Sequence, residues 1–307
     1  MWRKQQQRPG FSLLLVLIAA SVVLTGCGSH FVLLHPAGPV ARREWHVIEL
    51  AASAMAVVIA FVFVLFAIAL VRFRDVPNNR AAYAPEWSGS RKLELAWFAI
   101  PVVIVAIIAV PTVRTTYALD RIPPSSSPLI INVTSLDWKW LFEYPSQHIA
   151  TVNYVTIPAG RPVLFELTAD SPMNTFWVPQ LGGMEYTMPG RVLPLWLQAS
   201  KPGVYPGRSG NFSGSGFVHM VFVVRAVPST TFARWQRHVR HTAQPMSLHQ
   251  YHLLLVPDIS KPQTYYRYPA STFPSTAHGF TLKGGMYMEM SLPHQKSHAV
   301  QGKVASQ

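Results

Sequence analysis

Two long apolar segments dominate the first half of the chain. Residues 47–71 are almost wholly apolar, and residues 95–113 form a second such run that is interrupted by Pro101 and Pro111. A helix of about 20 apolar residues is long enough to cross the hydrocarbon core of a bilayer. Membrane helices also tolerate proline when neighbouring helices satisfy the freed carbonyl groups. The pattern therefore predicts two membrane-spanning helices, over 47–71 and 93–116.

Basic residues cluster directly after the first apolar segment and predict its orientation. The loop over residues 72–92 is rich in Arg and Lys, opposed only by Asp75 and Glu86. Cytoplasmic loops carry such an excess of Lys and Arg. We therefore expect this loop in the cytoplasm, with the segment 27–46 and everything after residue 116 outside the cytoplasmic membrane.

Short apolar runs follow a linker over residues 117–128 that is rich in proline and serine. Turn residues separate the runs at regular intervals, which is typical of a β-sandwich. We predict seven or more strands in a domain over 129–227, with a turn cluster at 201–207. The runs cover residues 129–135, 138–144, 151–157, 163–169, 176–178, 192–199 and 217–224.

One further helix is expected after the sandwich. Residues 229–241 begin with a serine and carry Phe232, Trp235 and Val239 at helical spacing. The sequence beyond is rich in His, Pro, Tyr and Met without periodicity and predicts an exposed, irregular tail. The predicted fold class is thus membrane-anchored α plus all-β, with a short helical and irregular C-terminal tail over 228–307.

The first 26 residues have the pattern of a signal peptide. A basic start is followed by the apolar stretch 11–23 and by LTGC at 24–27. This ending resembles the bacterial lipoprotein processing box, in which the cysteine is acylated and becomes the mature N-terminus. Cys27 is the only cysteine of the chain, so it cannot form an internal disulfide. We expect a signal peptide over 1–26 and a lipid on Cys27; the alternative is an uncleaved anchor with an incidental thiol.

Composition narrows the class of function. Half of the 307 residues are apolar and unevenly distributed, as in a membrane protein with a separate soluble part. The net charge is +13, but the basic residues are scattered without a dense run, which argues against nucleic-acid binding. The sequence has no nucleophile–base pair, phosphate-binding loop or Cys/His zinc set. No catalytic residue is therefore predicted in this chain.

A loop rich in Gly and Ser, GRSGNFSGSGFVHM at 207–220, lies late in the predicted sandwich. In a cupredoxin, a loop at this place holds copper through thiolate and imidazole ligands. The loop contains no cysteine. Its one histidine, His219, is expected on a strand with its side chain on the face opposite to Met220.

The organisation as a whole, from Cys27 to Arg240, resembles subunit II of the haem-copper terminal oxidases. That family has two spans with a cytoplasmic connection and an external cupredoxin-like β-sandwich. Five stretches carry the resemblance together, although any one alone is a weak signal. They are residues 83–90 (YAPEWSGS), 93–97 (LELAW) with Pro101, 135–142 (SLDWKWLF), 175–182 (TFWVPQLG) and 201–205 (KPGVY).

The resemblance implies which positions would hold metal. In the family's cytochrome c oxidases the external domain carries a dinuclear copper centre, CuA, bound by two His, two Cys, a Met and a Glu carbonyl. Serine hydroxyls do not replace bridging thiolates, so we expect no metal in this chain and a core-filling role for the methionine. The corresponding positions here are Asn174, Ser209, Asn211, Ser213, Phe217 and Met220.

Loss of this centre is what the resemblance associates with quinol oxidases, and residues 133–142 are similar to those of the cytochrome bo-type ubiquinol oxidases. In those complexes quinol delivers electrons to haem in the large subunit. The implied partners are oxidase subunits I, III and IV, ubiquinol and membrane lipid. Haems and a copper ion are expected in subunit I, and no cofactor is expected in this chain. The implied location is the bacterial inner membrane, with a periplasmic C-terminal domain.

Glu94 is the one residue of the spans with an expected chemical role. It has the placement of the family's carboxylate at the cytoplasmic mouth of a proton channel into subunit I, and a carboxylate at a membrane boundary is costly. The alternative is an interfacial anchor beside Arg91 and Lys92. Asp137 and Glu143 are expected at a solvated edge of the sandwich; the alternative is that they help to dock subunit I.

Two other functions stay open at this point. One is a CuA-type subunit II of a cytochrome c oxidase, which conflicts with Ser209, Ser213 and Phe217. The other is a free-standing envelope lipoprotein that binds metal through its histidine-rich tail. Co-purification with a large haem-containing subunit separates the oxidase interpretation from the free-standing one.

Overall fold

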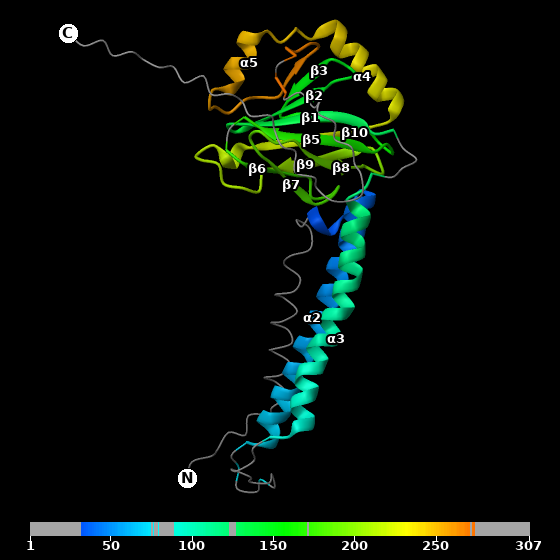
Figure 1. Ribbon diagram of the computed structural model, residues 1–307, viewed down its shortest axis with the longest axis vertical. Helices are drawn as coiled ribbons and strands as arrows, with labels where there is room; N and C mark the ends of the chain where they lie inside the picture. Colours follow the sequence, from blue (N-terminus) through cyan, green and yellow to red (C-terminus); the bar gives the residue numbers. More distant parts are fainter. Residues whose placement is uncertain are drawn as a thin grey trace, which may run out of the picture.

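The computed structural model of the chain describes residues 32–74, 76, 79, 89–122, 127–170, 172–270 and 272–273. Two long helices form a hairpin, and a β-rich head sits at one end of it (Figure 1). The helices are α2 (Pro39–Arg72) and α3 (Arg91–Leu119), and the short 3-10 helix η1 (Val32–Leu34) precedes them. The predicted signal peptide, the lipidation site at Cys27 and the tail from residue 274 onward lie outside the described residues.

Both helices are long and apolar enough to cross a membrane, in agreement with the two predicted spans. The most apolar window of each helix is 0% buried, and such continuous apolar exposure suits lipid rather than water. α2 begins at Pro39, well before the predicted start at residue 47, because its first turn is buried against the head at Val40 and Ala41. α3 continues to Leu119, so the predicted linker begins in a helix.

The head is a sandwich of two sheets. One sheet has the strand order β11-β3-β2-β1-β5-β8 and the other has the order β4-β10-β9-β6-β7. The pairs β1–β5 and β10–β4 are parallel, whereas the other neighbouring strands are antiparallel. The strands are β1 (Leu129–Leu136), β2 (Lys139–Tyr144), β3 (Ile149–Val152), β4 (Tyr154–Pro158), β5 (Val163–Ala169), β6 (Asn174–Trp177), β7 (Met184–Thr187), β8 (Leu193–Leu197), β9 (Gly203–Arg208), β10 (Val221–Val227) and β11 (Gln263–Tyr265).

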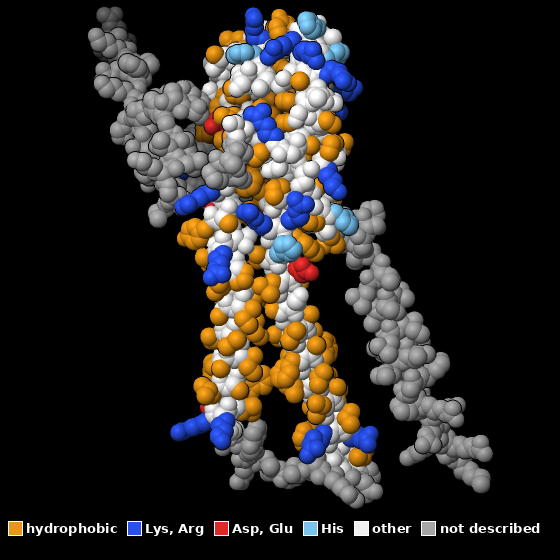
Figure 2. Space-filling model, turned by 90° about the vertical axis from the view of Figure 1, so that its right-hand side faces the viewer, with side chains coloured by type: hydrophobic (Ala, Val, Ile, Leu, Met, Phe, Trp, Pro, Cys, Tyr) orange, Lys and Arg blue, Asp and Glu red, His pale blue; other side chains and the backbone are white. Residues whose placement is uncertain are grey.

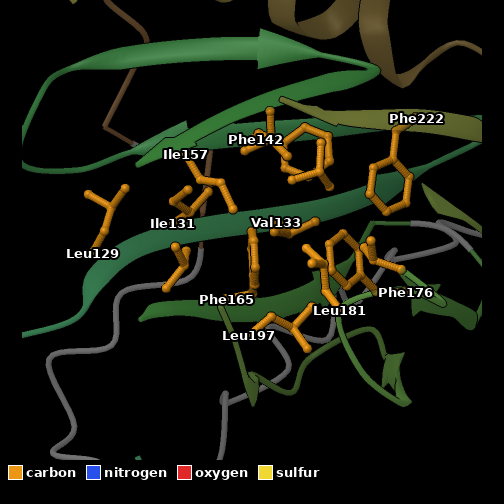
Figure 3. Close-up of a cluster of buried hydrophobic side chains, with 14 of the residues drawn as sticks. Leu129, Ile131, Val133, Phe142, Ile157, Phe165, Phe176, Leu181, Leu197 and Phe222 are labelled. Carbon is orange, nitrogen blue, oxygen red and sulfur yellow. The ribbon is translucent and has the colours of Figure 1, made fainter. Parts of the chain in front are cut away.

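An aromatic cluster fills the space between the sheets, as Figure 3 shows for several of its members. Trp140 and Phe142 of β2 and Phe165 of β5 are 0% exposed. Phe176 of β6 stacks on Phe222 of β10 with ring centroids 4.7 Å apart. The Trp140 ring meets both of these rings edge-on, at 5.5 and 5.3 Å. Such ring pairs stabilise the core by more than the burial of their surface alone. They also fix the two sheets relative to each other, and with them the loops that connect the strands.

Three of the predicted boundaries are wrong in detail. Residues 151–157 form two strands, β3 and β4, because the chain turns at Asn153 with a φ of 59°. β9 replaces the turn cluster predicted at 201–207, and alternate residues of this strand are buried. β10 begins only at Val221, because residues 217–219 form the 3-10 helix η2 (Phe217–His219).

The segment after the sandwich is more ordered than predicted. α4 (Ser229–Thr242) forms as expected, but α5 (Leu248–Leu255) and β11 follow it, and β11 extends the first sheet by pairing with β3. Tyr251 and Leu254 of α5 pack with Leu141 of β2 in a second buried cluster. We call residues 244–273 the C-terminal cap. Apart from β11, which belongs to the sheet, the cap packs on β1 to β3, on the face of the six-stranded sheet that points away from the aromatic core.

Candidate functional site

The positions that correspond to copper ligands in the resembling family gather at one end of the inner strands of the five-stranded sheet. Asn174 is the first residue of β6, and Ser209 directly follows β9, the strand that pairs with β6. Ser213 lies in the loop that leaves β9, Phe217 lies in η2, and Met220 comes just before β10. The fold therefore brings together residues that are separated in the sequence.

Ser209 and Asn174 are both buried, and they are bonded to each other. The Oγ of Ser209 donates to Oδ1 of Asn174 at 3.1 Å, and Nδ2 of Asn174 donates to the carbonyl oxygen of Pro172 at 2.9 Å. The Ser209 hydroxyl also lies 3.4 Å from both the backbone N and O of Asn211. Buried polar groups are costly unless they are hydrogen-bonded. These contacts satisfy the side chains within the protein.

Met220 is a core residue, as expected for an apolar filler. Its side chain is 1% exposed within the main hydrophobic cluster, and its Sδ lies 3.9 Å from the Oγ of Ser213. Phe217 packs its ring against Phe212 with centroids 5.9 Å apart. His219 is exposed in η2. The prediction that it lies on a strand opposite Met220 is wrong, because the chain turns through a 3-10 helix there.

Trp138 holds the loop against the sandwich. It occupies the turn between β1 and β2 with a φ of 61°, and its Nε1 donates to the carbonyl oxygen of Ser213 at 3.0 Å. A Cβ on Gly216 would lie 2.2 Å from the Trp138 ring, and one on Gly214 would lie 3.1 Å from it. Glycine lets the backbone approach the ring this closely. The glycines of the loop therefore shape it around the indole.

The donor set at the six positions does not fit a CuA centre. The side chains offer two amides, two hydroxyls, a phenyl ring and a thioether, with neither a thiolate nor an imidazole. Copper in this kind of centre is held by soft thiolate and imidazole donors, which neutral hydroxyls do not replace. Within the described part of the chain, moreover, no three His, Cys, Asp or Glu side chains come close enough to hold a metal ion.

Glu94 lies in the first turn of α3, at the end of the hairpin away from the head (Figure 1). Its backbone N–H donates to the carbonyl oxygen of Ser90 at 3.0 Å. A carboxylate in the first turn stabilises a helix electrostatically. The side chain is exposed in this chain, next to Arg91 and Lys92, which leaves it open to a partner within the membrane.

The head is joined closely to the hairpin, a feature that the sequence did not predict. Glu44 of α2 accepts a hydrogen bond from the backbone N–H of Gly183 at 3.0 Å. A Cβ on Gly38 would lie 2.3 Å from the carbonyl oxygen of Gln198, so the chain needs glycine there. A cavity of about 770 Å³ opens beside this contact, between the helix ends and the start of β7. The close backbone contacts fix the direction of the hairpin relative to the head.

Two ionisable side chains, Lys139 and Glu143, are buried beneath the C-terminal cap. Lys139 is 2% exposed, and its Nζ donates to the carbonyl oxygens of Leu254 and Val256 at 3.0 and 2.7 Å. Glu143 is 0% exposed, so its predicted place at a solvated edge is wrong. Its Oε1 accepts a hydrogen bond from Thr272, while Oε2 has no partner among the described residues. Burial raises the pKa of Glu143 to about 7 and lowers the pKa of Lys139.

Two family models match the chain. The model for Cytochrome C oxidase subunit II, transmembrane domain, matches residues 31–115, which contain α2 and most of α3. The model for Cytochrome C oxidase subunit II, periplasmic domain, matches residues 139–227, which contain the sandwich from β2 to β10.

Several bacterial proteins are similar over most of their length. Quinol oxidase subunit 2 of Bacillus anthracis is 43% identical over 254 residues, which cover 82% of this chain and 87% of that protein. Quinol oxidase subunit 2 of a Bacillus cereus strain is 43% identical over 265 residues, which cover 85% of this chain and 91% of that protein. The protein of the same name from Bacillus subtilis is 40% identical over 250 residues, which cover 80% of this chain and 78% of that protein.

Proposed function

Because this chain belongs to the cytochrome c oxidase subunit II family of the haem-copper terminal oxidases, we propose that it is the copper-free subunit II of a quinol oxidase. Its relatives named quinol oxidase subunit 2 are 40–43% identical to it over most of its length. The chain is a membrane-anchored subunit of an oxidoreductase complex with an external cupredoxin-like head. The complex oxidises quinol and reduces oxygen to water, and this chemistry takes place in the partner subunit I.

The observation that carries this proposal is the donor set at the former copper positions. Ser209 and Asn174 bond to each other where the family's copper-containing members have a cysteine and a histidine. Cytochrome c is water-soluble, so its electrons need an external relay to reach the membrane subunit. A lipid-soluble quinol reaches that subunit directly. A head without thiolate and imidazole ligands suits a quinol donor and disfavours the CuA-type alternative.

The finer parts of the proposal concern partners and modifications. The hairpin anchors the head and packs against subunit I, which holds the haems and a copper ion, and subunits III and IV complete the complex. Ubiquinol is the electron donor. Cys27 carries a lipid after removal of the signal peptide, and Glu94 takes up protons at the cytoplasmic mouth of a channel into subunit I. The complex couples oxygen reduction to proton translocation.

Mild-detergent purification of the tagged chain tests the proposal. We expect it to co-purify with a polytopic subunit that gives a haem spectrum, and we expect oxygen consumption with a soluble ubiquinol analogue but not with reduced cytochrome c. Isolation of the chain without a haem-containing partner would instead support the free-standing lipoprotein. Oxygen consumption driven by reduced cytochrome c would contradict the copper-free assignment.

A further inference from the structure

The helix α4 carries a basic face that the oxidase function does not use. Three arginines and two histidines lie between Arg234 and His241, and the helix contains no acidic residue. Arg234, Arg237, His238 and His241 follow the spacing i, i+3, i+4, i+7, which places them on one side of a helix. Arg240 adjoins them. We call these five residues the α4 basic face.

The arginines of this face are exposed, and no acidic side chain neutralises them within the described part of the chain. All five side chains are exposed, while Phe232 and Val239 bury the opposite side of the helix. No ion pair among the described residues involves α4. The one ion pair found there joins His46 and Glu49 of α2. Among the residues that the structure describes, one side-chain hydrogen bond involves the α4 arginines, and it runs from Arg240 to the carbonyl oxygen of Gln147 at a long 3.4 Å. The charge of the face is therefore available to a partner.

The place of α4 in the molecule narrows the kind of partner. α4 lies at the end of the head opposite the hairpin (Figure 1), and Figure 2 shows Lys, Arg and His side chains gathered at that end. The face therefore points away from the membrane that holds the hairpin, which disfavours lipid headgroups. None of the exposed large hydrophobic residues of the described chain lies on α4. The centre of an interface with a folded protein is enriched in aromatic anchors, so a face without exposed large hydrophobic residues suits a charged, extended partner better.

We propose that the α4 basic face binds an extended polyanion of the cell envelope that carries repeating phosphate groups. The stripe from Arg234 to His241 is about 10 Å long, so it can contact successive anionic groups of one linear chain. The helix has arginine and no lysine, and the planar guanidinium matches phosphate oxygens bidentately. This inference rests on the external position of the head and not on the identity of the electron donor.

The test uses the purified complex in nanodiscs of neutral lipid, with fluorescent inorganic polyphosphate as the probe. We expect binding that weakens steeply as salt rises, because it depends on charge. The variant R234Q/R237Q/R240Q should lose about tenfold or more in affinity and show a shallower salt dependence. Glutamine is a good helix former, so the unfolding temperature and the quinol oxidase activity should stay unchanged.

The control variant R191Q/K201Q/R208Q removes the same charge from other exposed sites and should bind polyphosphate as the wild type does. The proposal is overturned by no binding of the wild type near 0.1 M salt, by an equal loss in the control variant, or by equally tight binding of polyglutamate. Preferential binding to vesicles of phosphatidylglycerol would also overturn it, in favour of a lipid surface. Failure of quinol-driven oxygen consumption would contradict the proposed function, but it would not affect the inference that the α4 basic face binds polyphosphate.

Discussion

Glu143 is the residue whose ionisation bears most directly on the stability of the head. Its pKa of about 7 lies above the ordinary value of 4.5, because the carboxyl is buried beneath the C-terminal cap. The folded state therefore favours the protonated form. The stability that this preference provides is present below the ordinary pKa and is lost as the pH rises through about 7.

We expect Glu143→Gln to remove this pH dependence, because the amide stays neutral. In the wild type the loss between about pH 5 and pH 8 amounts to at most about 3 kcal/mol. Thermal unfolding of the detergent-purified chain across this pH range measures it. Tyr251 and Tyr268, which also face Glu143, do not titrate in this window because burial raises their pKa. A wild-type unfolding temperature that is constant from pH 5 to 8, or a decrease of equal size in the variant, would contradict the assignment.

Glu94 offers a second prediction at the level of one side chain. Glu94→Gln keeps the size and polarity of the side chain but cannot carry a proton, so it should slow proton uptake while the KM for quinol stays unchanged. Turnover and protons translocated per electron, measured in liposomes, provide the readout. Glu49→Gln is the matched control, because Glu49 is an exposed carboxylate near the opposite end of the hairpin. Wild-type turnover and proton stoichiometry in Glu94→Gln would rule out a channel role.

At the level of elements, the loop after β9 depends on its contact with Trp138. We expect Gly216→Ala to destabilise the head by about 1–3 kcal/mol, because the new Cβ would overlap the indole ring and force a shift. Ser215→Ala, at an exposed neighbouring position, should change stability little. The unfolding temperatures of the two variants test this difference. Equal stability of Gly216→Ala and the wild type would show that the indole does not hold the loop.

The membrane hairpin and most strands follow from local sequence, because lipid-facing helices need continuous apolar runs and half-buried strands alternate. β9 escaped prediction because its proline and its two glycines are turn residues in most contexts, yet alternate positions of the strand face the core. The break at Asn153 depends on one residue with positive φ. Neither β9 nor the break between β3 and β4 leaves a hydrophobic periodicity in the sequence from which it could be predicted.

The C-terminal cap escaped prediction for a different reason. Its helix and strand are short, and they are stabilised by contacts with distant residues. Glu143 bonds to Thr272, which is 129 positions away, and Lys139 bonds to the carbonyl oxygen of Leu254, which is 115 positions away. Neither contact can be inferred from a single sequence. The sequence alone therefore does not distinguish a buried glutamate from an exposed one. The positions that correspond to copper ligands, by contrast, were assigned from the resemblance. The fold brings them together at one end of β6, β9 and β10.

At the scale of the whole molecule, the chain is a membrane hairpin that carries a closely attached external head. The contacts of Glu44 with Gly183, and of Gly38 with the chain near Gln198, fix the head on the helix ends. The head is a cupredoxin-like sandwich, and hydroxyl and amide groups occupy the positions that the resemblance assigns to the copper ligands. The molecule is therefore suited to anchoring and assembling an oxidase rather than to relaying electrons.

The central claim is that this head holds no copper. Metal analysis of the purified complex, expressed as copper per haem iron, tests it most directly. We predict that this ratio does not change after the head is removed by proteolysis. A ratio that corresponds to two more copper atoms per complex, lost together with the head, would contradict the account.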